Sequence, residues 1–274
     1  MEMRVLKNDG TLETFDRRKV EGALIKSGAS GSLAREVTDI VEGKMHENMK
    51  TSEIYKLAFE TLASYKPGAA FRYGLKRALL DMGPEGHAFE TYVGAILGAH
   101  GHEIKLRQVL NGKCIQHEVD VVAKKNGKVI VYECKYHNKP GLRCHIQNAL
   151  YTYARFLDLR DTGAAEAGAL ATNTKFSYDV IQYAQCVKLG LLGWSYPQTG
   201  SLQELIEAQK LYPVNMLTGV DRHIFYRLHD ANIITVKEFL LATDAQLEKA
   251  SVPSKAIEKI RQQAREVMNG NGKH

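Results

Sequence analysis

The spacing of apolar and polar residues divides the chain into three segments, separated by glycine- and proline-containing breaks at residues 82–86 and 196–200. In the first segment, two short apolar runs flank an Asn-Asp-Gly turn within residues 3–15, which is typical of a β-hairpin. Helical spacing follows over residues 17–29 and 51–65. We therefore expect a small hairpin followed by helices.

The second segment mixes helical and strand periodicity. The pattern predicts a helix from about His87, strands from about Val109 to Tyr136, a second helix from about Leu142 and a strand within residues 167–173. This combination is an α/β pattern.

The third segment carries only helical spacing from about Leu202, interrupted at Pro213, Gly219 and Pro253. A small all-helical module is therefore expected at the C-terminus. Taken together, the three patterns predict a multidomain α+β protein. The expected domains are residues 1–84, 85–200 and 201–274.

Composition narrows the class of protein without identifying it. The 274 residues are 44% hydrophobic and 25% charged, and no run of about eighteen apolar residues could cross a bilayer. The N-terminal residues are charged where a signal peptide needs an apolar core, so we expect a cytoplasmic protein without a membrane partner. The four cysteines form no CxxC pair, which favours reduced thiols over a zinc site. A net charge of +6 gives weak support for a nucleic-acid partner.

The second segment contains a strong hairpin signal at Asn126-Gly127, because a type I′ turn requires positive φ at both central residues. With these two residues as the loop, counting outward sets Asp120 opposite Glu133 and Glu118 opposite Lys135. Alternation along the strand also places Glu133 and Lys135 on one face. The turn therefore predicts two acidic side chains side by side, next to a lysine.

Two neighbouring carboxylates destabilise a sheet unless something neutralises them. A Mg²⁺ ion held by Asp120 and Glu133 would do so, and Lys135 could then assist attack on a phosphodiester. A solvated hairpin face, with Glu118 paired to Lys135, explains the same residues without chemistry.

Residues 86–106 and 117–137 resemble the Mrr-type branch of the PD-(D/E)XK restriction-endonuclease-like superfamily. The resemblance implies an α/β core with a central mixed sheet. The resemblance implies that Asp120, Glu133 and the helical Glu90 hold Mg²⁺ or Mn²⁺, and that Lys135 assists hydrolysis. Gln147 corresponds to a polar residue often found near the site in that branch, although it could equally pack at the edge of the core.

Basic residues around the predicted carboxylates suggest contacts with a phosphate backbone, although a solvated charge run explains them as well. The residues expected to contact nucleic acid are Lys124, Lys125, Lys139, Arg143 and Lys175.

The first segment contains neither a Walker A sequence nor a GxGxxG turn, so motif spacing alone predicts no nucleotide. In order and spacing, however, it resembles the ATP-cone, a nucleotide-sensing domain. The resemblance implies an allosteric ATP or dATP site lined by Val5, Lys7, Glu13, Asp16, Lys19, Thr51 and Lys76, with Asn8 where many members have a second basic residue.

The third segment is similar to tandem helix-hairpin-helix modules, in which a glycine-bearing turn presents helix N-terminal amides to a phosphate. Gly219 fits the first turn, whereas Ser251-Val252-Pro253 occupies the second, where glycine would be usual. Packing or dimerisation therefore explains this module as well as DNA contact does.

These patterns and resemblances lead to one functional expectation and two rivals. We expect a metal-dependent DNA endonuclease, regulated by ATP or dATP and assembled as a dimer or larger homo-oligomer. The rivals are a catalytically silent, nucleotide-responsive DNA-binding regulator and a nuclease of RNA or branched DNA.

Overall fold

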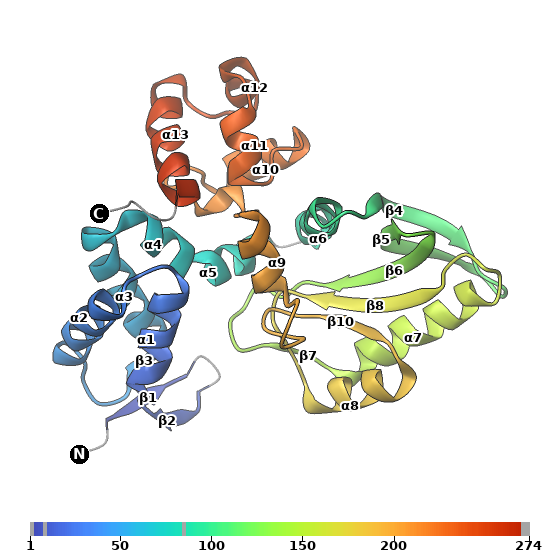
Figure 1. The fold of residues 1–274 in the computed structure, drawn as a ribbon, viewed down its shortest axis with the longest axis horizontal. Helices are drawn as coiled ribbons and strands as arrows, with labels where there is room; N and C mark the ends of the chain where they lie inside the picture. The colour runs from blue at the N-terminus through green and yellow to red at the C-terminus, as the bar shows by residue number, and fades with distance from the viewer. Residues whose placement is uncertain (1–2, 8–9, 84–85, 270–274) are drawn as a thin grey trace. The chain divides into compact units, whose positions relative to one another are not determined.

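A computed structural model of the chain describes residues 3–7, 10–83 and 86–269 (Figure 1). The chain forms two compact units. Residues Met1–Ala78 and Tyr212–His274 make up one, called here the terminal unit, and residues Leu79–Leu211 make up the other, the central unit. The division into domains at 1–84, 85–200 and 201–274 stays a prediction. No helix in the described part of the chain is both long and apolar enough to cross a bilayer.

The N-terminal part of the terminal unit is a small sheet covered by helices, as the apolar pattern predicts. Its sheet has the order β2-β1-β3, with β1 antiparallel to β2 and parallel to β3. The helices bury one face each around Leu24, Val37 and Leu62. The elements are β1 (Arg4–Leu6), β2 (Leu12–Thr14), α1 (Arg17–Lys26), α2 (Gly31–Gly43), β3 (Met49–Lys50), α3 (Thr51–Tyr65), α4 (Pro67–Tyr73) and α5 (Leu75–Leu80).

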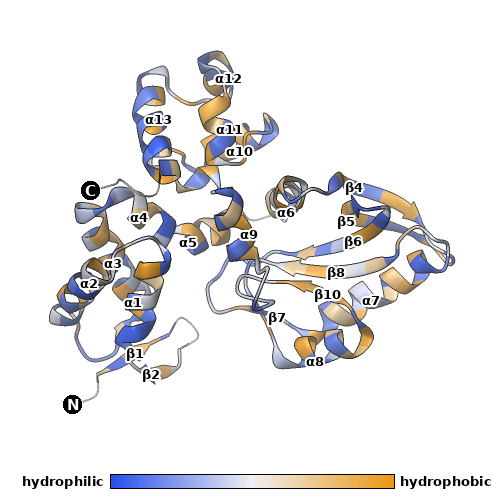
Figure 2. Cartoon of the chain, viewed as in Figure 1, coloured by the Kyte–Doolittle hydropathy of each residue, from blue (hydrophilic) through white to orange (hydrophobic). Residues whose placement is uncertain are grey.

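The C-terminal part of the terminal unit is helical, again as predicted. Thr235 and Thr243 each start a helix with a capping box, which satisfies N–H groups that would otherwise lack partners. Apolar and polar residues alternate around the last helix, α13, which buries Ile257, Ile260 and Val267 (Figure 2). The elements are η1 (Val214–Met216), α10 (Arg222–Asp230), α11 (Val236–Leu241), α12 (Asp244–Lys249) and α13 (Ser254–Asn269).

The central unit is built on a five-stranded mixed sheet in the order β10-β8-β6-β5-β4. Strands β6, β8 and β10 are parallel, whereas β4, β5 and β6 form an antiparallel meander. The first strand begins at Glu103, six residues before the expected start. The elements are α6 (His87–Ala99), β4 (Glu103–Asn111), β5 (Gln116–Lys125), β6 (Lys128–Lys135), β7 (Arg143–Cys144), α7 (Ile146–Arg160), β8 (Ala167–Thr172), β9 (Lys175–Phe176), α8 (Tyr178–Val187), β10 (Gly190–Leu192) and α9 (Leu202–Gln209).

The two-residue turn between β5 and β6 is confirmed. Asn126 and Gly127 have φ values of +52° and +80°, as a type I′ turn requires. Lys125 pairs with Lys128, and the ladder continues in the predicted register as far as Val121 and Tyr132. The turn therefore fixes the pairing of residues 121–125 with residues 128–132, and the ladder ends one position before Asp120 and Glu133.

Helices α6 and α7 cover opposite faces of this sheet. Gly94 of α6 lies against Ile104 and Leu106 of β4. Val131 of β6 packs instead with Leu159 of α7. Alternation along paired strands puts these two sets of strand residues on opposite faces, so the sheet is buried on both sides.

Candidate functional site

The carboxylate of Asp120 lies where β5 and β6 stop pairing. One of its oxygens, Oδ2, accepts a hydrogen bond from the backbone N–H of Cys134 at 2.7 Å. Burial raises the pKa of Asp120, the bond from Cys134 opposes that rise, and the charge of Glu90 adds to it. The side chain is therefore held against β6, beside Glu133.

Glu133 on β6 is largely buried and has an arginine as its partner. Burial and the charge of Asp120 raise the pKa of Glu133 to about 7. The guanidinium of Arg155 on α7 donates to its Oε2 at 2.5 Å and also donates to the hydroxyl of Tyr151. Arg155 thus supplies the opposite charge that two neighbouring carboxylates need.

Sequence reasoning missed Arg155, although a signal was present. Gln147, Tyr151 and Arg155 follow one another at intervals of four residues and therefore lie on one face of α7. Gln147 is exposed in the first turn of this helix. Counting two turns onward from Gln147, which the sequence singled out, would have reached the arginine.

Glu90 belongs to the same electrostatic cluster. It lies in the first turn of α6 and is only 9% exposed. Its Oε2 is 3.3 Å from Nδ1 of His87 and 3.6 Å from Nη1 of Arg107. Because its charge raises the pKa of both Asp120 and Glu133, the three predicted metal ligands share one region of the central unit.

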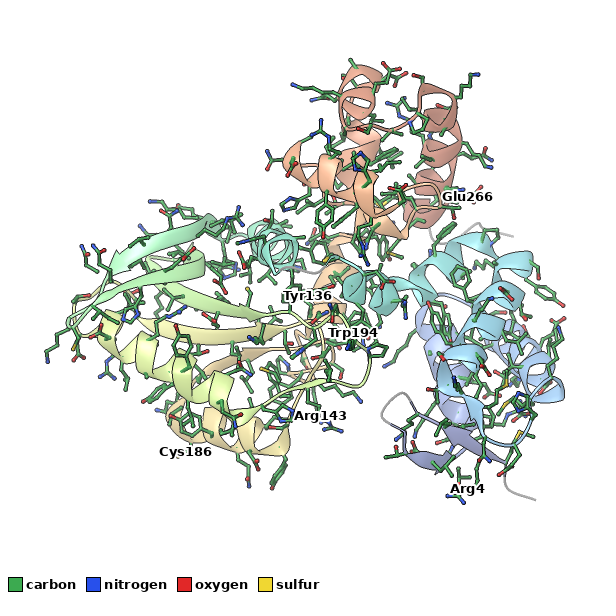
Figure 3. All side chains as sticks on the ribbon, turned by 180° about the vertical axis from the view of Figure 1, so that it is seen from behind. Arg4, Tyr136, Arg143, Cys186, Trp194 and Glu266 are labelled. Carbon is green, nitrogen blue, oxygen red and sulfur yellow. The ribbon has the colours of Figure 1, made fainter. Side chains whose placement is uncertain are left out.

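Four exposed basic residues gather at the edge of the sheet where the parallel strands β6 and β8 end. Lys135 ends β6 and lies close enough to lower the pKa of Glu133. Lys139 lies in the loop that follows, and Arg143, labelled in Figure 3, pairs with Lys175 between β7 and β9. Since parallel strands end at a common edge, this positive charge lies on the same side as the carboxylates.

The structure does not bring Lys124 and Lys125 to this edge. They precede the turn at the far end of the hairpin, and four residues of strand put Lys124 roughly 13 Å from Asp120. The amino group of Lys125 donates to the carbonyl of His100 at 2.8 Å. These two lysines therefore stand apart from the carboxylates.

The backbone beyond β6 is held by buried polar groups. Asn173 accepts from the N–H of His137 at 2.9 Å and donates to its carbonyl at 2.8 Å. The hydroxyl of Thr172 donates to the carbonyl of Lys135 at 2.7 Å. The hydroxyl of Tyr136, labelled in Figure 3, donates to the carbonyl of Leu80 at 2.6 Å. Lys135 is thus presented from a fixed strand end.

The donor set suits a magnesium ion better than a transition metal. Among residues 3–7, 10–83 and 86–269, no three His, Cys, Asp or Glu side chains form a group that could hold a metal. Mg²⁺, however, is usually bound through one or two carboxylates, with waters and substrate phosphates completing its shell. Asp120 and Glu133 offer those carboxylates, and an ion there would replace the charge that Arg155 supplies to Glu133.

At the N-terminus, the structure joins three of the residues expected around a nucleotide. Glu13 on β2 forms ion pairs with both Lys7 and Lys19, the latter at 2.9 Å. These two lysines lower the pKa of the Glu13 carboxyl to about 2. Glu13 faces Val5, which is buried in the core, across the β1–β2 ladder. An anionic ligand could therefore replace Glu13 as the partner of both lysines.

The remaining residues expected at that site are spread over neighbouring elements. Asp16 caps α1 by accepting from the N–H of Arg18 at 3.0 Å. Thr51 opens α3 directly after β3, at the edge where Lys7 follows β1. Lys76 lies in α5, and Asn8 lies outside the described residues.

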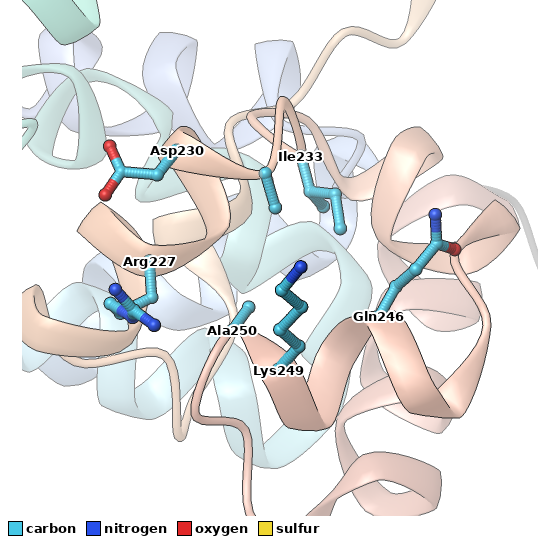
Figure 4. A pocket seen from close by; sticks show the side chains of 7 residues that line it. Arg227, Asp230, Ile233, Gln246, Lys249 and Ala250 are labelled. Carbon is cyan, nitrogen blue, oxygen red and sulfur yellow. The ribbon is translucent and has the colours of Figure 1, made fainter.

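Two features of the C-terminal helices bear on phosphate contact. Gly219 and Ser251 have φ values of +97° and +65°, so the serine adopts the backbone conformation of the glycine it replaces. A hollow of about 330 Å³ lies beside Arg227 and Lys249 (Figure 4). Both residues occupy the last turn of a helix, where basic side chains offset the negative end of the dipole. The hollow is therefore a poor site for a phosphate.

Comparison with known proteins confirms the N-terminal domain. Residues 3–79 match the ATP cone domain family. An uncharacterised protein of Archaeoglobus fulgidus is 34% identical over 173 residues, which are 63% of this chain and 98% of the relative. The crystal structure of a protein of unknown function, AF1548, covers 68% of this chain and 100% of that protein's chain, with 33% identity and a TM-score of 0.61.

Proposed function

This chain belongs to the same family as the uncharacterised protein of Archaeoglobus fulgidus and carries an ATP cone domain, and from this premise we propose that it is a Mg²⁺-dependent nuclease of DNA controlled by ATP or dATP. The observation that carries the proposal is the pair of partly buried carboxylates on neighbouring strands, Asp120 and Glu133. Each has a raised pKa, so the pair gains from binding a cation.

The residues around the pair have distinct roles in hydrolysis. Asp120 and Glu133 would hold the metal ion, with Glu90 adding negative charge beside them. When bound, Mg²⁺ or Mn²⁺ polarises a phosphodiester and lowers the pKa of a coordinated water. Lys135, presented at the end of β6, orients the attacking water or stabilises the charge that develops on the phosphate.

The exposed cations at the same edge suit a nucleic-acid backbone. Lys135 pairs with Thr172 where β6 and β8 end, Lys139 follows β6 in the chain, and Arg143 pairs with Lys175, which follows β8. Cations that neutralise phosphates release counterions from DNA, so affinity should fall steeply with salt. Gln147, exposed at the start of α7, would contact the strand near its scissile phosphate.

The ATP cone supplies regulation. Lys7 and Lys19 already share one anionic partner, Glu13, and a triphosphate would compete with it for both amino groups. If ATP or dATP binds one conformational or assembly state more tightly than the other, binding shifts the population towards that state. Calorimetric titration tests this step, and no heat at millimolar ATP or dATP would refute it.

Cleavage of supercoiled plasmid tests the nuclease directly. Nicking with Mg²⁺ or Mn²⁺ is expected for the full chain, and Asp120→Asn and Lys135→Ala should each abolish it. Lys128→Ala, at the far end of the hairpin, is the matched control and should cleave like the wild type. Equal activity in all four proteins would assign the cleavage to another site or to a contaminant.

One observation favours a second function. The guanidinium of Arg155 already provides an opposite charge to Glu133 in the absence of a metal. A nucleotide-responsive DNA-binding regulator needs no more than that. Such a protein would bind DNA equally well in chelator and in Mg²⁺ and would cut none of it. A panel of linear DNA, branched DNA and RNA would distinguish this regulator from a nuclease that acts on another substrate.

A further inference from the structure

A surface groove adjoins the carboxylate cluster on the α7 side of the central unit. Its volume is about 470 Å³, within the range of small-molecule sites. Ile115 and Tyr151 form its walls and are 63% and 56% exposed. Lys113, Cys114, His117, Arg155, Asp158 and Asp161 also line it.

The floor of this groove is rigid. The Asp158 carboxylate accepts hydrogen bonds from the backbone N–H groups of Cys114 at 2.8 Å and Ile115 at 3.3 Å. The ring Nε2 of His117 lies 2.8 Å from the same carboxylate. A Cβ on Gly112 would collide with it, so the chain passes as close to α7 as glycine allows. The β4–β5 connection is thereby bound to the helix, and the groove is preformed.

Arg155 connects the groove to the carboxylates. Its guanidinium donates to Glu133 on one side and lies 4.7 Å from the centroid of the Tyr151 ring on the other. The arginine covers only part of the ring, since the tyrosine stays more than half exposed. Because Arg155 contacts both Glu133 and Tyr151, a strand whose phosphate reached the carboxylates would bring a neighbouring nucleotide towards Tyr151.

The chemistry of the lining fits a nucleobase. An aromatic ring and an aliphatic side chain offer faces for stacking, which tolerates any base. The negative charge of Asp158 is already engaged by His117 and by backbone N–H groups, so the floor does not repel a strand. Lys113 is paired with Asp161, which also lines the groove, at 3.6 Å, and Arg155 is paired with Glu133, so the charges of the lining are largely balanced.

We propose that this groove is a subsite for one unpaired base of the substrate strand, next to the scissile phosphate, and that the enzyme therefore prefers single-stranded, flapped or frayed DNA. A base within a duplex has both faces covered by its neighbours and must be extruded before it can stack on a protein ring. The choice of substrate rests on the proposed nuclease function, whereas the base-binding groove can be tested without cleavage.

The test is a binding measurement in chelator with oligonucleotides that carry 2-aminopurine. Full-length wild type is compared with Tyr151→Ala, with Tyr151→Phe, which keeps the ring, and with Tyr178→Ala, which removes a tyrosine that is 69% exposed on α8. Anisotropy gives the affinity, and 2-aminopurine fluorescence reports stacking.

Tyr151→Ala should weaken single-strand binding about fivefold or more, the range expected for one stacked base, and should abolish fluorescence quenching. Duplex affinity should change less than twofold, and the Tyr151→Phe and Tyr178→Ala variants should bind like wild type. The subsite would be overturned if Tyr151→Ala bound single strands as tightly as the wild type does. It would also be overturned if the substitution weakened duplex binding as much as single-strand binding. Tyr151-dependent quenching without cleavage in Mg²⁺ would instead overturn the nuclease and leave the subsite standing.

Discussion

Replacing Arg155 by methionine should make the stability of the metal-free protein depend on pH in a specific way. The arginine and Glu133 are mostly buried, with side chains 13% and 20% exposed. With the arginine present, Glu133 has a pKa of about 7, above the ordinary value of 4.5. Because the positive charge of Arg155 lowers this pKa, removing it raises the pKa further.

The sign and size of the effect follow from proton linkage. When a carboxyl has a higher pKa in the folded state, the folded protein binds more protons, so stability falls as pH rises between the unfolded and folded pKa values. For Glu133 this fall runs from about pH 4.5 to about 7 in the wild type and continues beyond 7 in the variant. The slope is at most about 1.4 kcal/mol per pH unit.

Between pH 7 and pH 8, the free energy of unfolding should therefore fall by about 1 kcal/mol more in the variant than in the wild type. The lost packing of the arginine side chain adds a decrease that does not depend on pH. Urea unfolding in EDTA at pH 6, 7 and 8 measures this difference. Arg160→Met removes a more exposed arginine from the end of the same helix. Its difference from the wild type in the free energy of unfolding should not increase with pH. If the difference in the free energy of unfolding between wild type and Arg155→Met is the same at all three pH values, Arg155 does not compensate the charge of Glu133.

Three backbone predictions can be checked by the same unfolding method. Gly127→Ala should destabilise the hairpin by about 1–2 kcal/mol, because φ is +80° at this position. Gly168→Ala should cost about 1–3 kcal/mol, since a new Cβ would lie 2.7 Å from the Cβ of Phe156. Ser251→Gly should instead stabilise the helical module by about 0.5–1 kcal/mol, because φ is +65° there and glycine tolerates it.

The parts of the structure that sequence could predict depend on local rules. The type I′ turn at Asn126 and Gly127 sets the register of β5 and β6, and alternation then decides which side chains share a face. The same register, together with the bond from Cys134 to Asp120, explains how two acidic residues separated by thirteen positions come together.

The parts that sequence did not predict depend on packing between distant segments. Arg155 reaches Glu133, and Asp158 reaches His117, only because α7 lies on the sheet. The four-residue spacing puts Arg155 on the same face of α7 as Gln147, but it does not specify that this face meets Glu133. The two-residue strand β3 is too short to show a pattern at all. Lys124 was placed near the carboxylates from its position in the sequence, although strand geometry moves it to the other end of the hairpin.

A direct test of the central claim is the crystal structure of the full chain soaked in Mn²⁺, with the ion located by its anomalous scattering. We expect an anomalous peak from an ion bound by the carboxylates of Asp120 and Glu133, and this peak should be weaker or absent in Asp120→Asn. A fully ordered site with no peak at millimolar Mn²⁺, and Arg155 still bonded to Glu133, would contradict it.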